Sequence, residues 1–509
     1  MNSPLRTLLL LAFFPGLICA GHDSVAFAAD TVASKERPNI LYIYTDDHSY
    51  RAISCYPGSH PWVQTPNIDQ LAKEGMRFDA AYIGTWCMPS RATQLTGRHQ
   101  FGIESMRMEG PYPRSEYDPE QCPFWPKTFR EQGYFTGQIG KWHTGTDTGF
   151  GRDWDYQLVW NRPKFTGSSG HYYYDQPVTF HGGETKTIKE YSTDKYTDWA
   201  TDFIKGDGRD TSKPWYLWLC YGAVHGPYTP ADRHLADYEA VDIGIPSDIF
   251  PPRPGKPEWA SEFGVWEKGK DGLPYTKNKS YYDQVRQYHQ AVRAIDEGVG
   301  RLLRALEESG QRENTLIVFT ADQGYAWGQH GFRHKLAGYD ANLRAPLIMS
   351  MPGRIPAGTV CQTPVGGVDI PPTFFRIAGL EIPDSMHGYD LSPLMENPQA
   401  EWDHPVLIAN TWREYGSNTD TPPADGMGGQ NIPWYVMFRD GKYKYIRSMI
   451  PGELEELYDL EADPEELTNL VKEKHLRPQL EALRAGAIAE LKRTQAGFVD
   501  KLPPVRELE

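Results

Sequence analysis

The chain has 509 residues and a formal net charge of −15 at pH 7, and 39% of its residues are hydrophobic and 13% aromatic. This composition supports a sizeable core and excludes an intrinsically disordered chain. The acidic balance argues against a nucleic-acid-binding protein, which normally shows a basic footprint, although a local basic pocket for an anionic substrate is compatible with it.

The first 28 residues are typical of a secretory signal peptide. Arg6 precedes an apolar run over residues 8–20, and Ala26-Phe27-Ala28 forms a small-x-small cleavage site. The run is shorter than the roughly 20 residues that a membrane-spanning helix needs. We therefore expect an exported protein, periplasmic or secreted, without a membrane span.

Strand and helix patterns alternate along residues 29–395. The patterns predict buried strands at residues 39–45, 134–139, 215–221, 315–320 and 346–351, and helices at residues 67–75 and 281–306. Such alternation favours a largely parallel sheet with helices on both faces. We interpret residues 29–395 as one large α/β domain.

Two segments, residues 151–191 and 241–280, are rich in Gly, Pro, aromatic and charged residues. They are predicted to be long surface insertions, a frequent place for substrate recognition. The aromatic run His171-Tyr172-Tyr173-Tyr174 in the first segment is able either to stack on sugar rings or to pack within its own loop.

The pattern changes after residue 395. Short strands are predicted at residues 406–409, 435–438 and 442–446, with a turn at Asp440-Gly441, and a closing helix at residues 476–493. Residues 396–509 are therefore predicted to form a smaller α+β C-terminal domain. Four cysteines outside the leader and the motif below, Cys55, Cys122, Cys220 and Cys361, allow three complete disulfide pairings or remain buried thiols.

Residues 85–99 read TWCMPSRATQLTGRH, with Cys87, Pro89 and Arg91 at positions i, i+2 and i+4. A residue at a helix start faces unpaired backbone N–H groups and the positive end of the helix dipole, which stabilise an anionic nucleophile and a bound anion. Arg91, about one turn on, is able to reach the same place. The motif without its context also describes a buried cysteine before a helix with Pro in its first turn.

Oxygen-bearing side chains follow two of the predicted strands. Asp46-Asp47 comes after the first strand, and Asp322-Gln323 comes after the strand at residues 315–320. Their oxygens suit Ca²⁺ or Mg²⁺ rather than Zn²⁺. Because adjacent residues of a regular strand face opposite ways, the chain must curl for both members of a pair to bind one ion. Either pair alone is also compatible with a solvated acidic strand end.

Basic residues lie in three further motifs. Lys141 and His143 lie in GKWH, where an extended chain directs them to the same side. His225 follows the strand at residues 215–221 in AVHGP, and Lys335 lies in GQHGFRHK beside His334 and His330. Each motif alone is compatible with a packing role or an ordinary polar loop.

Together these segments resemble the type I sulfatases of the alkaline phosphatase superfamily. The run from Cys87 matches the signature C-x-P-S-R-x-x-x-x-T-G-R, and GKWH, HGYDLSPL at residues 387–394 and ELYDLEADPEELTNL at residues 456–470 resemble other family segments. The resemblance covers nearly all of the chain after the leader. It implies an alkaline-phosphatase-like α/β fold, a mixed sheet sandwiched by helices, with a smaller C-terminal α+β domain.

The resemblance also implies a mechanism. A maturation enzyme oxidises Cys87 to formylglycine, and one hydroxyl of the hydrated aldehyde attacks the sulfur of a sulfate ester. His225 or Lys335 protonates the departing alcohol, and His143 deprotonates the second hydroxyl. Family-implied ligands of Ca²⁺, preferred here over Mg²⁺, are Asp46, Asp47, Asp322, Gln323 and the oxygen of residue 87. Family-implied contacts to the sulfate or the substrate are Arg91, Lys141, His225 and Lys335. His330 and His334, which flank Lys335, are expected to support these contacts or to touch the substrate.

One residue departs from the family pattern, since Gln323 stands where the family usually has Asn or His. The long insertions match no known segment, and we expect a sulfated carbohydrate as the substrate rather than a simple aryl sulfate. Two alternatives remain at this point: a hydrolase of phosphate or phosphonate esters on the same scaffold, and a non-catalytic binder of sulfated glycans in which Cys87 stays a thiol.

Overall fold

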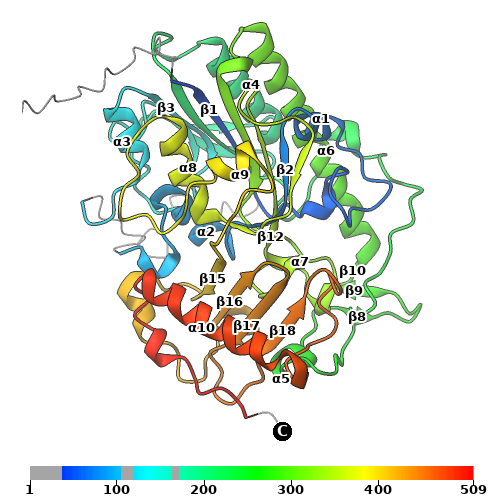
Figure 1. The fold of residues 1–509 in the computed structure, drawn as a ribbon. Coiled ribbons are helices and arrows are strands. Elements are labelled where there is room, and N and C mark those ends of the chain that lie inside the picture. The colour runs from blue at the N-terminus through cyan, green and yellow to red at the C-terminus, as the bar shows by residue number, and fades with distance from the viewer. Residues whose placement is uncertain (1–36, 105–119, 163–170, 508–509) are drawn as a thin grey trace, which may run out of the picture. The chain divides into compact units, whose positions relative to one another are not determined.

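The computed structural model describes residues 37–104, 120–162 and 171–507, so the predicted signal peptide lies outside the described residues. Within them, an 11-stranded mixed sheet has the order β13-β2-β12-β11-β1-β7-β3-β4-β5-β6, with β14 beside β2 (Figure 1). Its strands are β1 (Asn39–Thr45), β2 (Met76–Tyr82), β3 (Phe135–Lys141), β4 (Tyr156–Trp160), β5 (Gln176–Phe180), β6 (Thr185–Ile188), β7 (Trp215–Cys220), β11 (Thr315–Ala321), β12 (Arg344–Ser350), β13 (Thr359–Cys361) and β14 (Val365–Gly366).

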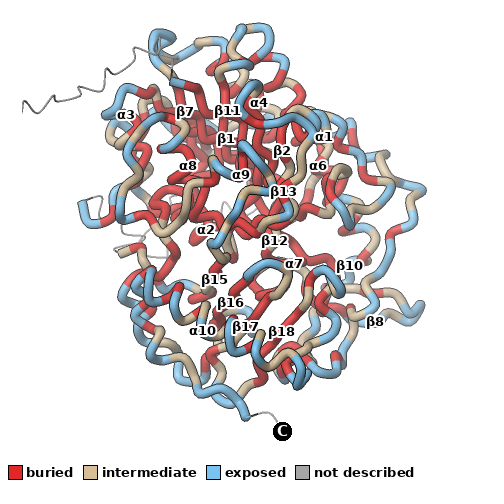
Figure 2. Tube along the Cα trace, viewed as in Figure 1, coloured by how far each residue is buried: buried red, intermediate tan, exposed pale blue. Residues whose placement is uncertain are grey.

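The central strands are apolar on both faces because helices cover both sides of the sheet. In β1, Leu41 and Ile43 enter one core, whereas Tyr42 and Tyr44 enter the other, as the two-residue period of a strand requires. The helices α1 (Pro66–Lys73), α4 (Ser192–Lys205) and α6 (Tyr281–Glu308) pack on the first face. The helices α2 (Cys87–Thr96), α3 (Pro126–Glu131), α8 (Ile370–Ile377) and α9 (Ser392–Glu396) pack on the second. Figure 2 shows the strands between these layers as buried.

A second, antiparallel sheet has the order β15-β16-β17-β18 and lies in the C-terminal part of the chain (Figure 1). Its strands are β15 (Val406–Asn410), β16 (Tyr435–Asp440), β17 (Tyr443–Ser448) and β18 (Glu456–Asp459). Helix α10 (Arg477–Arg493) packs on one face through Leu480 and Leu483. The other face joins a core that includes Tyr82 of β2. The prediction of a smaller C-terminal domain is confirmed, while its boundary at residue 396 stays a prediction.

The structure corrects the prediction for residues 151–191. Strands β4, β5 and β6 in this segment extend the main sheet beyond β3, because β4 pairs in parallel with β3, β5 pairs antiparallel with β4, and β6 pairs antiparallel with β5. Of the aromatic run, Tyr172 and Tyr173 are buried, so these two side chains pack inside the protein rather than facing a sugar. The segment thus contributes three strands to the main sheet and is not only a surface insertion.

Residues 241–280 form several short elements. They contain α5 (Glu258–Ser261) and a small sheet of β8 (Glu267–Lys268), β9 (Pro274–Thr276) and β10 (Lys279–Ser280). A further short helix, α7 (Asp340–Leu343), lies outside this segment. Cys55, Cys122, Cys220 and Cys361 are all free thiols. Among the described residues, no helix combines the length and the apolar character needed to cross a bilayer.

Candidate active site

The site lies where four parallel strands end. Strand β1 pairs in parallel with β11 and β7, and β7 pairs in parallel with β3. The pair Thr45 and Ala321 is the last of the β1–β11 ladder, so Asp46 and Asp322 leave the sheet side by side. The backbone N–H of Asp46 donates to Ala223 O over 2.9 Å, which joins the loop after β7 to the same edge. Carboxyl ends of strands are where open α/β sheets bind their ligands.

Cys87 is the first residue of α2, so it lies beside the unpaired N–H groups of the helix start. Its Sγ lies 3.2 Å from Asp46 Oδ1 and 3.0 Å from Lys335 Nζ, and the residue is buried. Burial and the Asp46 carboxylate raise the pKa of Cys87 well above its usual range. The thiol is therefore protonated, and a protonated thiol is a poor nucleophile.

Three buried carboxylates converge next to Cys87. One ligand atom from each of Asp46, Asp47, Cys87 and Asp322 lies within 4.8 Å of the others. Asp47 has a φ of 56°, in the left-handed region, so the chain curls after β1 as the sequence required of this pair. Asp322 Oδ1 accepts the Asp47 N–H over 2.9 Å, which fixes the curl.

The donor set fits a hard cation. Asp322 Oδ2 and Gln323 Oε1 are buried and have no hydrogen-bond partner within the described residues, and Gln323 Nε2 lies 2.5 Å from Asp47 Oδ1. Burial, and next the neighbouring Asp46 carboxylate, raise the pKa of Asp322 well above its usual range. Oxygen atoms left without partners in a group of carboxylates match the ligand preference of Ca²⁺ and Mg²⁺.

Three cationic side chains surround these carboxylates. Lys141, at the end of β3, contacts Asp46 Oδ2, and Lys335 Nζ lies 2.5 Å from Asp47 Oδ1. The guanidinium of Arg91 is fully buried, donates to Lys141 O over 2.9 Å and lies 4.0 Å from Asp46 Oδ1. Although burial acts to lower them, the neighbouring carboxylates hold the pKa values of Lys141 and Lys335 above their usual range. Both lysines are therefore charged.

The strand β3 ends at Lys141, and the chain does not stay extended to His143. His143 has a φ of 56°, and its Nε2 lies 3.3 Å from Arg162 Nη1. Burial and the charges of Lys141 and Arg162 lower the pKa of His143 well below its usual range. The charge of Lys141 still acts on His143 after this turn, so the His143 side chain belongs to the same site. Its imidazole ring is neutral.

His225 faces the carboxylates from the loop after β7. Its Nδ1 lies 2.8 Å from Gly226 O, so this nitrogen carries a proton, and its Nε2 lies 3.7 Å from Asp47 Oδ2. A ring nitrogen of His225 also lies within 4.8 Å of ligand atoms of Asp46 and Cys87. Burial, the largest effect, lowers the pKa of His225 to about 4.

The two remaining histidines have different surroundings. His334 is half-buried beside Lys335, and its Nδ1 lies 2.9 Å from Lys335 O. His330 Nδ1 lies 2.7 Å from Asp248, and its ring packs on Tyr339. His334 thus lies next to the site through Lys335. Burial lowers the pKa of His330 to about 3, so His330 lies against Asp248 as a neutral ring.

The structure adds residues that sequence reasoning missed. Tyr172 stacks on His225, its hydroxyl lies 3.5 Å from Lys141 Nζ, and Arg162 contacts His143. The aromatic run was visible in the sequence, but no local signal identified which tyrosine is buried against a histidine 53 positions later.

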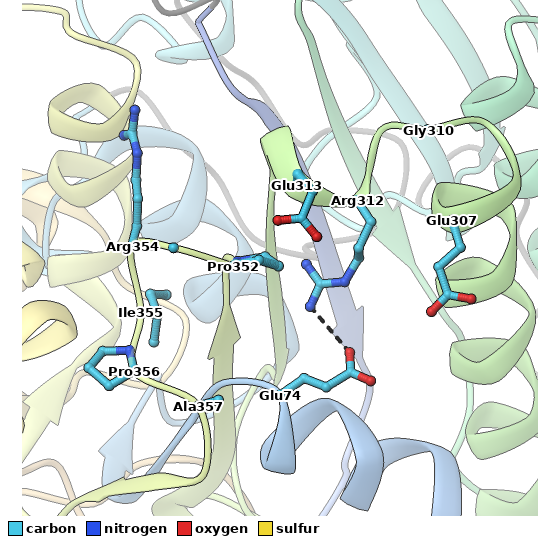
Figure 3. A pocket seen from close by; sticks show the side chains of 11 residues that line it. Glu74, Glu307, Gly310, Arg312, Glu313, Pro352, Arg354, Ile355, Pro356 and Ala357 are labelled. Carbon is cyan, nitrogen blue, oxygen red and sulfur yellow. Dashed lines mark hydrogen bonds and ion pairs between the residues drawn. The ribbon is translucent and has the colours of Figure 1, made fainter.

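A cavity of about 890 Å³ lies elsewhere (Figure 3). Arg312 and Glu313, which immediately precede β11, line it, and Arg312 Nη2 lies 3.4 Å from Glu74. It therefore borders the amino end of β11, whereas Asp322 lies at the carboxyl end. None of the residues predicted from the motifs lines this cavity, so it is not the catalytic cleft.

Comparison with known proteins identifies the chain's family. The family model described as sulfatase matches residues 38–380. The chain belongs to the sulfatase family. A second model, the C-terminal domain of N-sulphoglucosamine sulphohydrolase, matches residues 328–494. The predicted sulfatase and its type I, alkaline-phosphatase-like assignment are confirmed, and the protein is a sulfuric ester hydrolase.

Individual relatives agree with this assignment. The chain is 30% identical to an N-acetylglucosamine-6-O-sulfatase of Bacteroides thetaiotaomicron, over 93% of this chain and 88% of the relative. A solved structure in complex with its substrate D-glucosamine-2-N,6-O-disulfate is 27% identical, with a TM-score of 0.76 over 91% of this chain and 99% of that one. A phosphonate monoester hydrolase of Agrobacterium radiobacter, 22% identical with a TM-score of 0.65 over 90% and 96% of the chains, shares the fold.

Proposed function

We propose that this sulfatase is an exported enzyme that hydrolyses a sulfate ester on a sulfated carbohydrate, with formylglycine made from Cys87 as its nucleophile and Ca²⁺ as its metal ion. One observation carries the proposal: Cys87 begins α2 in contact with Asp46 and Lys335, next to buried carboxylates. A reactive group at this position meets both a metal-binding oxygen set and a positive side chain.

The chemistry at position 87 favours a modified residue. The unmodified thiol is buried and protonated, and a sulfate ester is an anion that repels a thiolate. A hydrated aldehyde at the same place supplies an oxygen nucleophile with a second hydroxyl for the release step. Oxidation requires a formylglycine-generating maturation enzyme as a partner before or during folding, because Cys87 is inaccessible in the folded protein.

Asp46, Asp47, Asp322 and Gln323 would hold the metal ion together with the oxygen of residue 87. Bound Ca²⁺ would supply positive charge next to the sulfate oxygens and polarise them. Gln323 reaches with one more methylene than Asn, and its unpartnered Oε1 supports a ligand role. An all-oxygen set of this size favours Ca²⁺ over Mg²⁺, which keeps several waters and demands stricter octahedral geometry.

The protein's own side chains supply the rest of the reaction. Arg91, Lys141 and Lys335 bind the sulfate, and their positive charges balance its negative charge in a buried site. The Lys335 ammonium faces the nucleophile and is placed to protonate the departing oxygen. His225 Nε2 faces the same place but carries no proton in the neutral ring, so His225 serves as the acid only when its ring is protonated.

The release step needs a base, and neutral His143 is suited to accept the proton of the second hydroxyl. His334, next to Lys335 and half-buried, is placed to contact the substrate. Arg91 stands on α2, one turn after residue 87, and the other side chains stand on the ends or loops of neighbouring strands, which keeps them at fixed distances from position 87.

A sulfated carbohydrate is the proposed substrate because two of the similar proteins are described by a sulfated sugar. The N-acetylglucosamine-6-O-sulfatase and the structure with bound D-glucosamine-2-N,6-O-disulfate each match more than nine-tenths of this chain. Export to the periplasm or the medium is proposed from the leader pattern in residues 1–28.

The proposal is tested by co-expressing the protein with a formylglycine-generating enzyme and weighing the tryptic peptide of residues 78–91. We expect the mass of an aldehyde in place of the Cys87 thiol, and turnover of N-acetylglucosamine 6-sulfate that Cys87→Ala abolishes while the melting temperature stays unchanged. An unmodified thiol, found although a control substrate of the maturation enzyme is converted, would refute the proposed nucleophile. Turnover of aryl sulfates alone would refute the proposed substrate.

A further inference from the structure

Tyr172, which precedes β5, contacts two residues of the proposed site. Its side chain is fully buried, and its ring lies parallel to that of His225, with centroids 4.1 Å apart and planes within 2°. Its hydroxyl lies 3.5 Å from Lys141 Nζ. The catalytic motifs of the sequence do not include this tyrosine, which lies in the aromatic run at residues 171–174.

Apart from this stack, few contacts within the described residues hold the ring of His225. Nδ1 bonds to Gly226 O over 2.8 Å, and the backbone carbonyl of His225 accepts from Tyr173 Oη over 2.7 Å. These bonds fix the loop and one ring nitrogen. The flat face of Tyr172 then sets the plane of the imidazole, and with it the direction in which Nε2 points toward Asp47.

Tyr172 is itself rigidly held. Its backbone carbonyl accepts from Gln176 Nε2 over 2.8 Å and from Ser192 Oγ over 2.7 Å, so both β5 and α4 hold its backbone. The rings of Trp160 and Tyr172 pack edge to face, with centroids 4.7 Å apart. A buried ring restrained on its backbone and its side is able to transmit a fixed orientation to its neighbour.

We propose that Tyr172 is a positioning residue that aims His225 at the reacting centre through this ring stack. The inference rests on the proposed function only in that His225 takes part in turnover. The flat ring is the essential feature, since offset or parallel aromatic pairs gain from defined geometry beyond their buried area. A shift of about 1 Å in such a group is enough to cost roughly 100-fold in rate.

The test is a double-mutant cycle in the mature enzyme, assayed with 4-nitrophenyl sulfate and N-acetylglucosamine 6-sulfate. We expect Tyr172→Leu to lower kcat about 10- to 100-fold, and Tyr172→Phe, which keeps the ring, to stay within about threefold of the wild type. In the His225→Ala background, Tyr172→Leu should cause almost no further loss, because a residue that acts through another is not additive with it. Tyr174→Leu, on the same segment but half-buried, is the matched control and should stay near wild type.

Additive losses in the double variant, or an equal loss for Tyr172→Phe and Tyr172→Leu, would overturn the inference. If Tyr172→Leu melts below the assay temperature, Tyr172→Met fills the volume without a flat face and is expected to show the same non-additivity. Wild-type turnover is measured first. If the wild type cleaves only the aryl sulfate, the proposed substrate fails, while the coupling of Tyr172 to His225 is still measured on that ester.

Discussion

Removing one carboxylate from the proposed metal site should separate metal binding from folding. Asp322→Asn keeps the shape of a fully buried side chain and an oxygen that accepts the Asp47 N–H, now 2.9 Å from Asp322 Oδ1. It removes one negative charge from a set in which burial and Asp46 already raise the pKa of Asp322. Without metal, the variant should be at least as stable as the wild type, because carboxylate repulsion is relieved.

The expected loss of affinity follows from Coulomb's law. The ligand atoms lie within 4.8 Å of one another, so an ion among them lies within about 4 Å of Asp322. A unit charge pair at that distance is worth about 4 kcal/mol at an effective dielectric constant of about 20, and a divalent ion doubles it before its dehydration is subtracted. A net loss of about 4 kcal/mol corresponds to a roughly 1,000-fold weaker Kd.

The assay is thermal unfolding with and without Ca²⁺, which needs no turnover. At a Ca²⁺ concentration near 100 times the wild-type Kd, the wild type gains about 2.7 kcal/mol, which raises Tm by a few degrees, whereas Asp322→Asn should gain almost nothing. Asp369→Asn, a buried carboxylate on another element, is the control that should keep the full shift. A full Ca²⁺-induced shift in Asp322→Asn would refute the assignment of the site.

Two stability predictions concern residues outside the proposed chemistry. Gly140→Ala should destabilise the protein by about 3 kcal/mol or more in urea unfolding, because φ is 101° and a Cβ would lie 2.0 Å from Cys220 O. The control Gly441→Ala, at φ 56° with open space around it, should cost about 1 kcal/mol. Equal costs for the two variants would contradict the steric argument. Burial raises the pKa of Asp369 to about 7, so the folded state binds a proton between about pH 4 and 7 and stability should fall as the pH rises through this window, by roughly 4 kcal/mol. Asp369→Asn should lose this dependence when unfolding is compared at pH 5 and pH 8.

Much of the site was predictable because its residues occur in short motifs attached to strong strands. The run at residues 39–45 ends at the predicted place, and Asp46 and Asp322 follow strands whose apolar character is continuous. Cys87, Arg91 and the helix that carries them are contiguous in sequence. Local patterns suffice wherever the chemistry and the element that positions it are adjacent in the chain.

Other parts were not predictable from local pattern. Strand β4 (YQLVW) lies between Gly-rich and polar stretches, and it is a strand because the free edge of β3 pairs with it. Tyr172 looks like any other member of an aromatic run, and only the packing of His225 distinguishes it from Tyr174. Both depend on partners far away in sequence, where tertiary contacts override propensity.

The charges of the site support the proposal that a metal ion and a sulfate ester bind in it together. Three buried carboxylates lie among three buried or nearly buried cationic side chains, so the protein's own charges nearly cancel; these residues are Asp46, Asp47, Asp322, Arg91, Lys141 and Lys335. A sulfate ester brings another negative charge into a place where water cannot screen it, and such a charge is costly unless it is paired. A divalent cation on the carboxylates would free the lysines and the arginine to face the sulfate. The charges of the site would therefore be balanced when the proposed metal ion and the sulfate ester bind together.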